Sequence, residues 1–295
     1  MFDRVESEFV TFFNVTCGIC IILMLTVILI STSRRRNVSE NVPDNVVLLY
    51  QVGRGPYAPS SSPFPLKLET FLRMYKIPYM NDHSGKFSSK GKTPWIKYNG
   101  VSVADSEFCI EFLKRKRNID KEKISPFLKA TGRALQKLTE ENLYWTMCYS
   151  MFVENQDMIA TVMPQYRGWR LKLLVIILSR VLRLEMWGHG IGRHSTNDIW
   201  HIGKEDICAL SNYLGERMFF LGDEPHEVDC ALFGMLAQII YHMPNSPHEK
   251  LIKEKHNNLS SYCKRMKDLY WPDWNERCYN VLTPKDDMGK IYFNY

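Results

Sequence analysis

One stretch, residues 46–113, limits the fold of this 295-residue chain more than any other. It opens with an apolar run at residues 46–50, which is typical of a buried strand. A helix is predicted next, because apolar side chains recur at i, i+3, i+4 and i+7, namely at Leu68, Phe71, Leu72 and Tyr75. Pro78 ends that helix, since proline cannot continue one.

A hairpin and a second helix complete this part of the chain. Residues 95–98 and 101–103 flank the dipeptide Asn99-Gly100, which accepts the positive φ angles of a tight two-residue turn. The residues after Asp105 are predicted to form a helix whose buried stripe consists of Cys109, Phe112 and Leu113. The pattern therefore predicts a small mixed sheet with helices, an α/β unit.

Ser62 lies where the first predicted helix begins. Backbone N–H groups and the helix dipole favour an anion there, and a hydroxyl that donates to a bound sulfur makes a thiol ionise more easily. The alternative is that Ser62 is only an N-cap, although Pro65 has no N–H to give to such a cap. Pro63 and Pro65 also remove two donors that an anion would meet. Both interpretations stay open, and Ser60 and Ser61 are close substitutes.

Two further dipeptides stand at places where a ligand can bind. Thr93-Pro94 precedes a predicted strand, and the surrounding pattern predicts a cis peptide bond that turns the backbone of Thr93 toward an extended ligand. Asp105-Ser106 opens a helix, where Ser106 and neighbouring N–H groups can bind a carboxylate while Asp105 meets an ammonium group. The alternative for this pair is helix capping, and both roles can hold together.

From about Pro126 onward, helical periodicity dominates and strand signals fade. One apolar helix face is formed by Val228, Leu232, Met235, Leu236, Ile239 and Ile240. Residues 171–184 are richly apolar, but they are too short and too charged to span a membrane. Lys172, Arg180 and Arg183 project from one side of this segment, within about 80° of one another. We expect a core helix here; the alternative is a basic amphipathic helix on a membrane surface.

Composition excludes several functions. The net charge of +6 is too mild to indicate nucleic acid, so no nucleic-acid partner is predicted. Cys17 and Cys20 form a C-x-x-C, but they lie inside an apolar segment, and the other cysteines lack metal-ligand spacing. His189, His194 and His201 share no clear face, so no metal site is predicted. Scattered, unpaired cysteines are typical of a reducing compartment.

Residues 12–30 form an almost unbroken apolar stretch of about 19 residues, long enough to cross a bilayer as a helix. The acidic start of the chain argues against the alternative, a cleaved signal peptide. Arg34, Arg35 and Arg36 follow this stretch, and positive charge stays on the cytosolic side. We therefore expect a single-pass membrane protein with a cytosolic globular part. The sequence does not identify the organelle, and the lysosome and other endomembranes are candidates.

Long motifs carry a resemblance to a known family: Ser62-Pro63-Phe64 and residues 67–79, 90–96, 104–108, 190–194 and 219–234. They closely resemble the failed-axon-connections family, which includes cadmium-responsive proteins of nematodes and is similar to the metaxins. The resemblance implies a glutathione-transferase-like fold, a thioredoxin-like domain followed by an all-helical one. The expected segments are an anchor with a basic flank (1–36), a linker (37–45), the thioredoxin-like domain (46–120), the all-helical domain (121–270) and a tail (271–295).

The resemblance also implies roles for the candidate site residues. Ser62 would stabilise the thiolate of glutathione, and the peptide would be held by Thr93, Pro94, Asp105 and Ser106. Pro65 departs from the family pattern, because similar sequences often carry a cysteine there, and this puts thiol–disulfide chemistry in doubt. No cofactor is expected apart from glutathione as a co-substrate.

A second departure lies in the helical half. Transferases place a Ser or Thr three residues before a buried aspartate, as the cap of a core helix. Here His226 holds that place before Asp229, so Asp229 is expected to keep a structural role without the usual box.

Two functions are consistent with the resemblance. The first is a membrane-anchored, glutathione-transferase-like protein of stress, cadmium or xenobiotic response. The second is a non-catalytic adaptor that uses the same fold for protein interactions at a membrane, in a metaxin-like or axon-development role. A homodimer or a membrane protein partner fits either function.

Overall fold

The computed structural model describes residues 42–119, 124–163, 168–279 and 290–292, which belong to one compact unit, Val38–Tyr295. The predicted anchor at residues 12–30 lies outside the described residues. Within the parts of the chain that are described, no helix combines the length and the apolar character needed to cross a bilayer.

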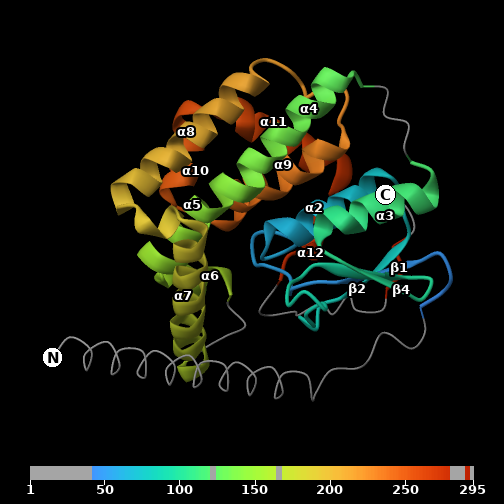
Figure 1. Ribbon diagram of the computed structural model, residues 1–295, viewed down its shortest axis with the longest axis horizontal. Coiled ribbons are helices and arrows are strands. Elements are labelled where there is room, and N and C mark those ends of the chain that lie inside the picture. Colours follow the sequence, from blue (N-terminus) through green and yellow to red (C-terminus); the bar gives the residue numbers. More distant parts are fainter. Residues whose placement is uncertain (1–41, 120–123, 164–167, 280–289, 293–295) are drawn as a thin grey trace, which may run out of the picture. The chain divides into compact units, whose positions relative to one another are not determined.

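The described elements alternate between strands and helices at first and are helical afterwards (Figure 1). The strands are β1 (Val47–Tyr50), β2 (Tyr79–Asp82), β3 (Trp95–Tyr98) and β4 (Val101–Ala104). The α-helices are α2 (Pro63–Met74), α3 (Ser106–Arg117), α4 (Pro126–Lys137), α5 (Tyr144–Tyr149), α6 (Asp157–Val162), α7 (Trp169–His189), α8 (Thr196–Leu214), α9 (Glu227–Ala237), α10 (Pro247–Lys255), α11 (Asn257–Tyr270) and α12 (Trp274–Arg277). Short segments of other helical geometry are η2 (Leu138–Leu143), η3 (Ser150–Glu154), η4 (Ile191–Arg193) and η5 (Gln238–His242).

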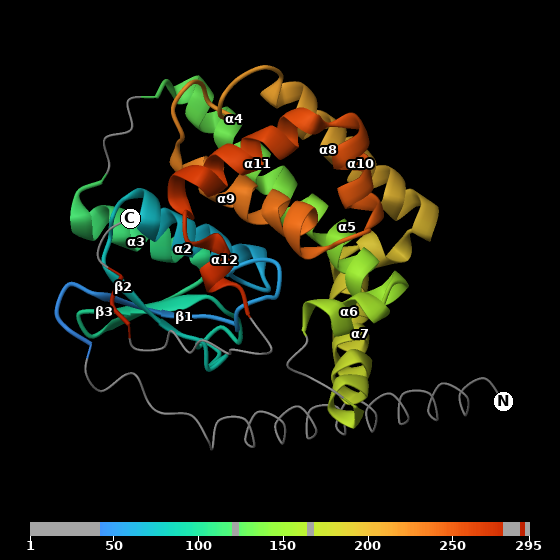
Figure 2. The same ribbon diagram turned by 180° about the vertical axis from the view of Figure 1, so that it is seen from behind.

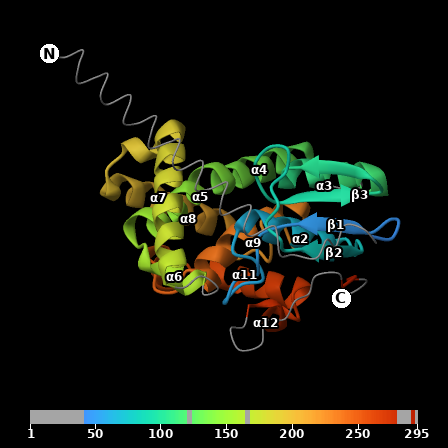
Figure 3. The ribbon, with the colours of Figure 1, turned by 90° about the horizontal axis from the view of Figure 1, so that it is seen from below.

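The four strands form one mixed sheet in the order β2-β1-β3-β4. β1 and β2 are parallel, whereas β3 runs antiparallel to both β1 and β4, and Figure 3 shows β3, β1 and β2 side by side. The predicted hairpin is confirmed, because Asn99 and Gly100 join β3 and β4 with φ angles of 47° and 79°. Helices α2 and α3 lie along one face of this sheet (Figures 1 and 2).

Helix α2 is buried on two sides. Leu68, Phe71 and Leu72 pack against the sheet, while Leu66 packs into the helical domain. On α9, a Cβ at Gly234 would come within 2.8 Å of the Pro63 carbonyl oxygen, so the absence of a side chain allows this close approach of α9 to α2. Helix α2 therefore forms the interface between the two domains, because it packs against the core of each.

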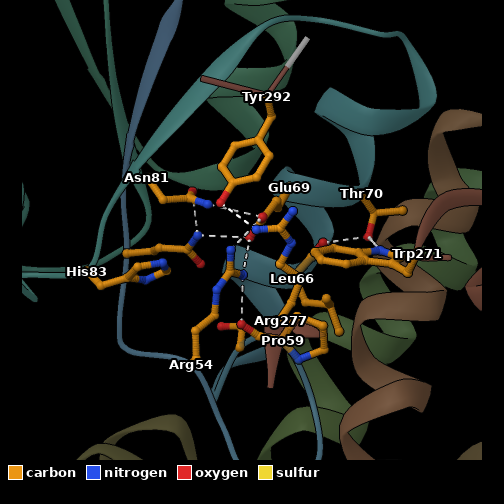
Figure 4. A network of polar contacts seen from close by, with 12 residues as sticks. Arg54, Pro59, Leu66, Glu69, Thr70, Asn81, His83, Trp271, Arg277 and Tyr292 are labelled. Carbon is orange, nitrogen blue, oxygen red and sulfur yellow. Dashed lines mark hydrogen bonds and ion pairs between the residues drawn. The ribbon is translucent and has the colours of Figure 1, made fainter. Parts of the chain in front are cut away.

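The Glu69 carboxylate lies at the centre of a fully buried polar network (Figure 4). Arg54 on the loop after β1 donates to both of its oxygens, at 2.8 and 3.0 Å. Further donors are Gln51 at 2.9 Å, the Tyr79 hydroxyl at 3.0 Å and Asn81 at 3.2 Å. Burial raises the pKa of Glu69, but the neighbouring guanidinium groups of Arg54 and Arg73 outweigh burial and hold it below its usual value.

Arg73 extends this network to the end of the helical domain. Its guanidinium lies 3.7 Å from the ring centroid of Trp271, and it donates to the Asp273 carboxylate at 2.6 Å. The Trp271 indole N–H donates to the Thr70 hydroxyl at 2.9 Å. These contacts fix the start of the C-terminal segment against α2, although the sequence suggested only an irregular tail after residue 270.

The last described residues return to the sheet. Tyr292 pairs with Tyr79 as an antiparallel bridge, with N–H to carbonyl distances of 2.8 and 3.3 Å. The Tyr292 hydroxyl accepts a hydrogen bond from Arg277 at 2.7 Å. The outer edge of β2 is therefore paired with the chain itself at Tyr79, where the strand begins.

Asp229 organises the start of α9 in the helical domain. Its buried carboxylate accepts hydrogen bonds from the backbone N–H of His226 at 2.8 Å, from that of Phe220 at 3.2 Å and from the Tyr262 hydroxyl at 3.0 Å. Burial raises its pKa to about 6, although these donors act in the opposite direction. His226 and Asp229 do form a capping box, so the histidine replaces the usual Ser or Thr.

The expectation that residues 171–184 form a core helix is wrong. They lie in α7, where only Ser179 and Met186 are buried. Figures 1 and 2 show α7 projecting past α6, away from the other helices of its domain. Most of its apolar side chains therefore lie outside the buried core, although Met186 is part of a small apolar cluster.

The network predicts how stability depends on Glu69 and on pH. Replacing Glu69 by Gln leaves the buried Arg54 guanidinium without its carboxylate, while Arg73 keeps Asp273, and should lower the free energy of unfolding at pH 7 by about 3–5 kcal/mol. A carboxylate with a lowered folded-state pKa stabilises above its unfolded pKa, and this contribution is lost as the pH falls through the folded-state pKa. The difference between wild type and Glu69→Gln, measured by urea denaturation, should therefore shrink once the pH falls below about 4.

The control for this measurement is Glu141→Gln. Glu141 is largely exposed and pairs with Lys137 on the surface, so its loss should cost at most about 0.5 kcal/mol at any pH. A gap between wild type and Glu69→Gln that stays constant or grows in acid would contradict the proposed charge balance.

Candidate functional site

Strand register brings two of the predicted site segments to one end of the sheet, and the loop that leaves β1 at this end leads to the third, Ser62. Tyr50 at the end of β1 pairs with Trp95 at the start of β3, and Trp95 pairs with Ala104 at the end of β4. Thr93-Pro94 therefore enters the sheet beside the point where Asp105-Ser106 leaves it. The Tyr50 and Trp95 rings stack at 3.7 Å, which fixes this end of the sheet.

The Thr93-Pro94 peptide bond is cis, as the pattern predicts. Pro94 is buried, whereas Thr93 is half-buried at the mouth of the strand. The loop before it is closed by Ser88, whose hydroxyl donates to the Lys92 carbonyl at 2.7 Å. Thr93 thus lies between a closed loop and a sheet strand.

Asp105 has a backbone conformation that is uncommon for a residue with a side chain, with φ 86° and ψ 133°. Its carboxylate accepts from the backbone N–H of Glu107 at 2.9 Å and of Phe108 at 3.5 Å, so it caps α3. Ser106, the first residue of α3, is 6% exposed. A strained backbone held by its surroundings is a common feature of binding sites, so the capping and binding interpretations remain compatible.

Ser62 is the N-cap residue of α2 in an extended conformation, but its side chain makes no cap hydrogen bond. Its backbone N–H donates to the Ser60 hydroxyl at 3.2 Å, and the Ser61 hydroxyl donates to the Gly53 carbonyl at 3.2 Å. Pro63 and Pro65 supply no N–H in this first turn, as the sequence indicates. Of the three serines, Ser62 is the one whose hydroxyl takes no part in these loop contacts.

A charged cluster that the sequence analysis missed lies beside Ser106. Lys67 of α2 is almost fully buried, and its ammonium group lies 2.5 Å from Glu107 of α3 and 2.7 Å from Glu140 of η2. Burial lowers the pKa of Lys67, but the two carboxylates raise it by more, so the group stays charged. Its partners lie 40 and 73 residues away in sequence, which is why no local pattern could indicate them.

This cluster borders a small hollow of about 160 Å³ between α3, α4 and α9. Its lining is mostly charged or polar: Glu107, Lys114, Lys129, Arg133, Gln136 and Glu227, beside Ile124, Gly132, Leu221 and Val228. Arg133 contacts Glu107 at 3.1 Å, and Lys114 pairs with Glu227. Charges in this hollow are therefore largely satisfied within the protein.

Two buried cysteines, Cys109 and Cys148, are not activated. Burial raises the pKa of Cys109 and of Cys148 to about 12, so both stay thiols at neutral pH. The structure brings together no cluster of three His, Cys, Asp or Glu side chains that could hold a metal ion among the residues it describes. Candidate chemistry at this end of the sheet therefore rests on hydroxyl groups, backbone groups and the Asp105 carboxylate.

Comparisons with known proteins agree with this architecture. The family model of the glutathione S-transferase N-terminal domain matches residues 63–158, and that of the C-terminal domain matches residues 203–266. The chain is 34% identical over 271 residues to Failed axon connections of Drosophila melanogaster, covering 84% of this chain and 64% of that protein. It thus spans less than two thirds of that relative.

Two more distant similarities point the same way. Metaxin-2 of Mus musculus is 22% identical over 245 residues, which cover 81% of this chain and 93% of that protein. A solved glutathione S-transferase of Ceriporiopsis subvermispora, in complex with glutathione, superposes with a TM-score of 0.53 at 16% identity. The superposition covers 76% of this chain and 98% of that one, and it shows the fold alone.

The class is therefore that of the glutathione S-transferase fold, with a thioredoxin-like sheet domain followed by a helical domain. The chain belongs to the glutathione S-transferase-like proteins and is related to Failed axon connections and the metaxins. The predicted family is confirmed, as is the predicted glutathione-transferase-like fold of the two domains.

The backbone at Asp105 generates a prediction about stability. Asp105→Ala removes the cap of α3 and places an ordinary side chain at a φ of 86°, so it should lower the free energy of unfolding by about 1–2 kcal/mol. Asp105→Gly loses the same cap but tolerates the positive φ, so its cost should be clearly smaller. Equal costs for the two variants in urea denaturation would mean that the backbone relaxes and stores no strain.

Proposed function

We propose that the chain binds glutathione, or a closely similar thiol peptide, at the end of the sheet formed by Ser62, Thr93 and Ser106. The observation that supports this proposal is that the start of β3 and the start of α3 meet at the end of the sheet where β1 ends, and that the loop from β1 leads to Ser62, whose side chain makes no cap hydrogen bond. Each element matches one part of such a ligand: a thiol, a peptide backbone and a carboxylate. The solved relative in complex with glutathione supports the choice of ligand.

Ser62 would be the catalytic residue of this site. Its hydroxyl would donate a hydrogen bond to the sulfur of the bound thiol and lower the thiol pKa, which raises the thiolate fraction at neutral pH. The thiolate would then attack an electrophilic carbon, forming a C–S bond as the leaving group departs or an epoxide ring opens. A bound glutathione complex of a soft metal such as cadmium would use the same contacts.

Binding is tested by calorimetric titration of glutathione into the full chain in detergent micelles. We expect an affinity in the micromolar to low-millimolar range, weakened about tenfold by Ser106→Ala through the lost hydroxyl contact to the carboxylate. Ser102→Ala is the matched control, because Ser102 is exposed on β4 and is not one of the proposed glutathione-binding residues. The absence of heat at millimolar glutathione would exclude the proposed ligand.

Turnover is tested separately with a generic electrophile such as an aryl halide. Ser62→Ala should lower the rate of conjugation by about tenfold to a hundredfold without changing the thermal unfolding midpoint, because its hydroxyl stabilises the thiolate and caps nothing. Ser61→Ala removes a hydroxyl that bonds the Gly53 carbonyl and serves as the comparison. Unchanged turnover in Ser62→Ala would show that the Ser62 hydroxyl does not stabilise the thiolate.

The second candidate is a non-catalytic adaptor at a membrane. Pro63 and Pro65 leave few N–H donors at the start of α2, and the Asp105 carboxylate already caps α3, which both favour this alternative. We further propose that residues 12–30 anchor the chain with its globular part in the cytosol. Resistance of the chain to alkaline carbonate extraction would support the anchor, and glutathione titration separates the two functions.

A further inference from the structure

Helix α7 exposes an apolar surface that the helical domain does not use. Trp169 is 70% exposed, Trp187 58%, Leu184 51% and Ile176 49%. The contacts that attach α7 lie in its second half, where Ser179 donates to the Phe152 carbonyl and Met186 packs in a small apolar cluster. Figures 1 and 2 show the rest of the helix extending beyond these contacts.

The exposed residues share one face. At about 100° per residue, Trp169, Ile176 and Trp187 fall within about 20° of one direction on the helix. The buried Ser179 and Met186 point away from that direction by about 80–100°. The two tryptophans stand roughly 27 Å apart along the helix axis, so they mark both ends of one continuous outward face.

This face is positively charged as well as apolar. Lys172, Arg180 and Arg183 are exposed and lie within about 60° of the same direction. The one acidic residue of α7, Glu185, lies about 160° away from it. The carboxylate of nearby Glu154 accepts hydrogen bonds from the Trp200 indole N–H at 3.1 and 3.2 Å, so it is held at Trp200.

An arginine guanidinium group lies next to the ring of each of these two tryptophans. Arg170 lies 5.6 Å from the Trp169 ring centroid and Arg193 lies 5.4 Å from that of Trp187. Tryptophan favours the boundary between water and hydrocarbon, and arginine next to it favours anionic headgroups at the same depth. The composition of this face fits that boundary better than it fits a protein core.

We propose that α7 lies on the surface of an anionic lipid bilayer, with Trp169, Ile176 and Trp187 in the interface and its cations on the headgroups. An anionic lipid is favoured over a second copy of this chain, because two such faces would bring only positive charge together. The proposal concerns a contact along the surface, since α7 is not long and apolar enough to cross a bilayer. It stands whether or not residues 12–30 act as an anchor.

The test uses the full chain and phosphatidylcholine vesicles, made with and without phosphatidylserine, whose acyl chains carry bromine. Bromine quenches tryptophan fluorescence only at the depth of the lipid, so the signal reports α7 rather than recruitment by another segment. We expect strong quenching in the anionic vesicles that is greatly reduced in Trp169→Phe/Trp187→Phe, because Trp169 and Trp187 are exposed. Of the other tryptophans, Trp271 and Trp274 are buried, and Trp95, Trp145 and Trp200 are only partly exposed. Added salt should reduce the quenching.

Arg180→Glu/Arg183→Glu should lower the quenching to the level of uncharged vesicles. Lys250→Glu/Lys255→Glu on α10 changes the net charge by the same amount at exposed positions elsewhere and should leave it unchanged. Equal quenching with and without phosphatidylserine, or an equal effect of the two double variants, would overturn the proposal. A dimer in analytical ultracentrifugation that Trp169→Ser/Trp187→Ser dissociates, without quenching by lipid, would assign the face to a second copy instead.

Discussion

The buried Glu69 carboxylate is the constraint on which the sheet domain depends. A charge without solvent must be paired, and here two guanidinium groups and three neutral donors share that task. These partners come from the loop after β1, from β2 and from α2 itself, so the carboxylate fixes three segments at once. Through Arg73 and Asp273 it also fixes the chain beyond α11.

The same network bears on the candidate site, because it holds the loop that leads to Ser62. Arg54 bonds both Glu69 and the Pro59 carbonyl, at 2.8 Å each, which leaves the loop little freedom just before the serines. On the other side, Lys67 ties the start of α3 to α2 and η2. Buried ion pairs therefore hold both the loop before Ser62 and the start of α3, which are the two parts of the candidate site that must be rigid for it to be preorganised.

Helix α7 shows where sequence interpretation failed and why. Its apolar residues suggested a core helix, because periodicity records how apolar a face is but not what covers it. The basic residues on the same face are the sequence feature that favours the alternative, a helix on a membrane surface, which stays a proposal. Conversely, the cis peptide before β3 and the hairpin at Asn99-Gly100 were predictable, since each depends on a short, local pattern. The structural role of Asp229 was implied by the family resemblance, and its buried hydrogen bonds agree with it.

The sequence by itself determined the family, the order of the elements and the identity of the dipeptides at the sheet end. The local preferences of proline, Asn-Gly and capping residues act over a few positions, so they can be predicted from the sequence without a structure. Only the tertiary structure decided that Lys67 pairs with Glu107 and Glu140, that Glu69 lies at a buried centre, and that α7 faces outward. Burial and pairing between distant residues are properties of the packed chain, and no local pattern encodes them.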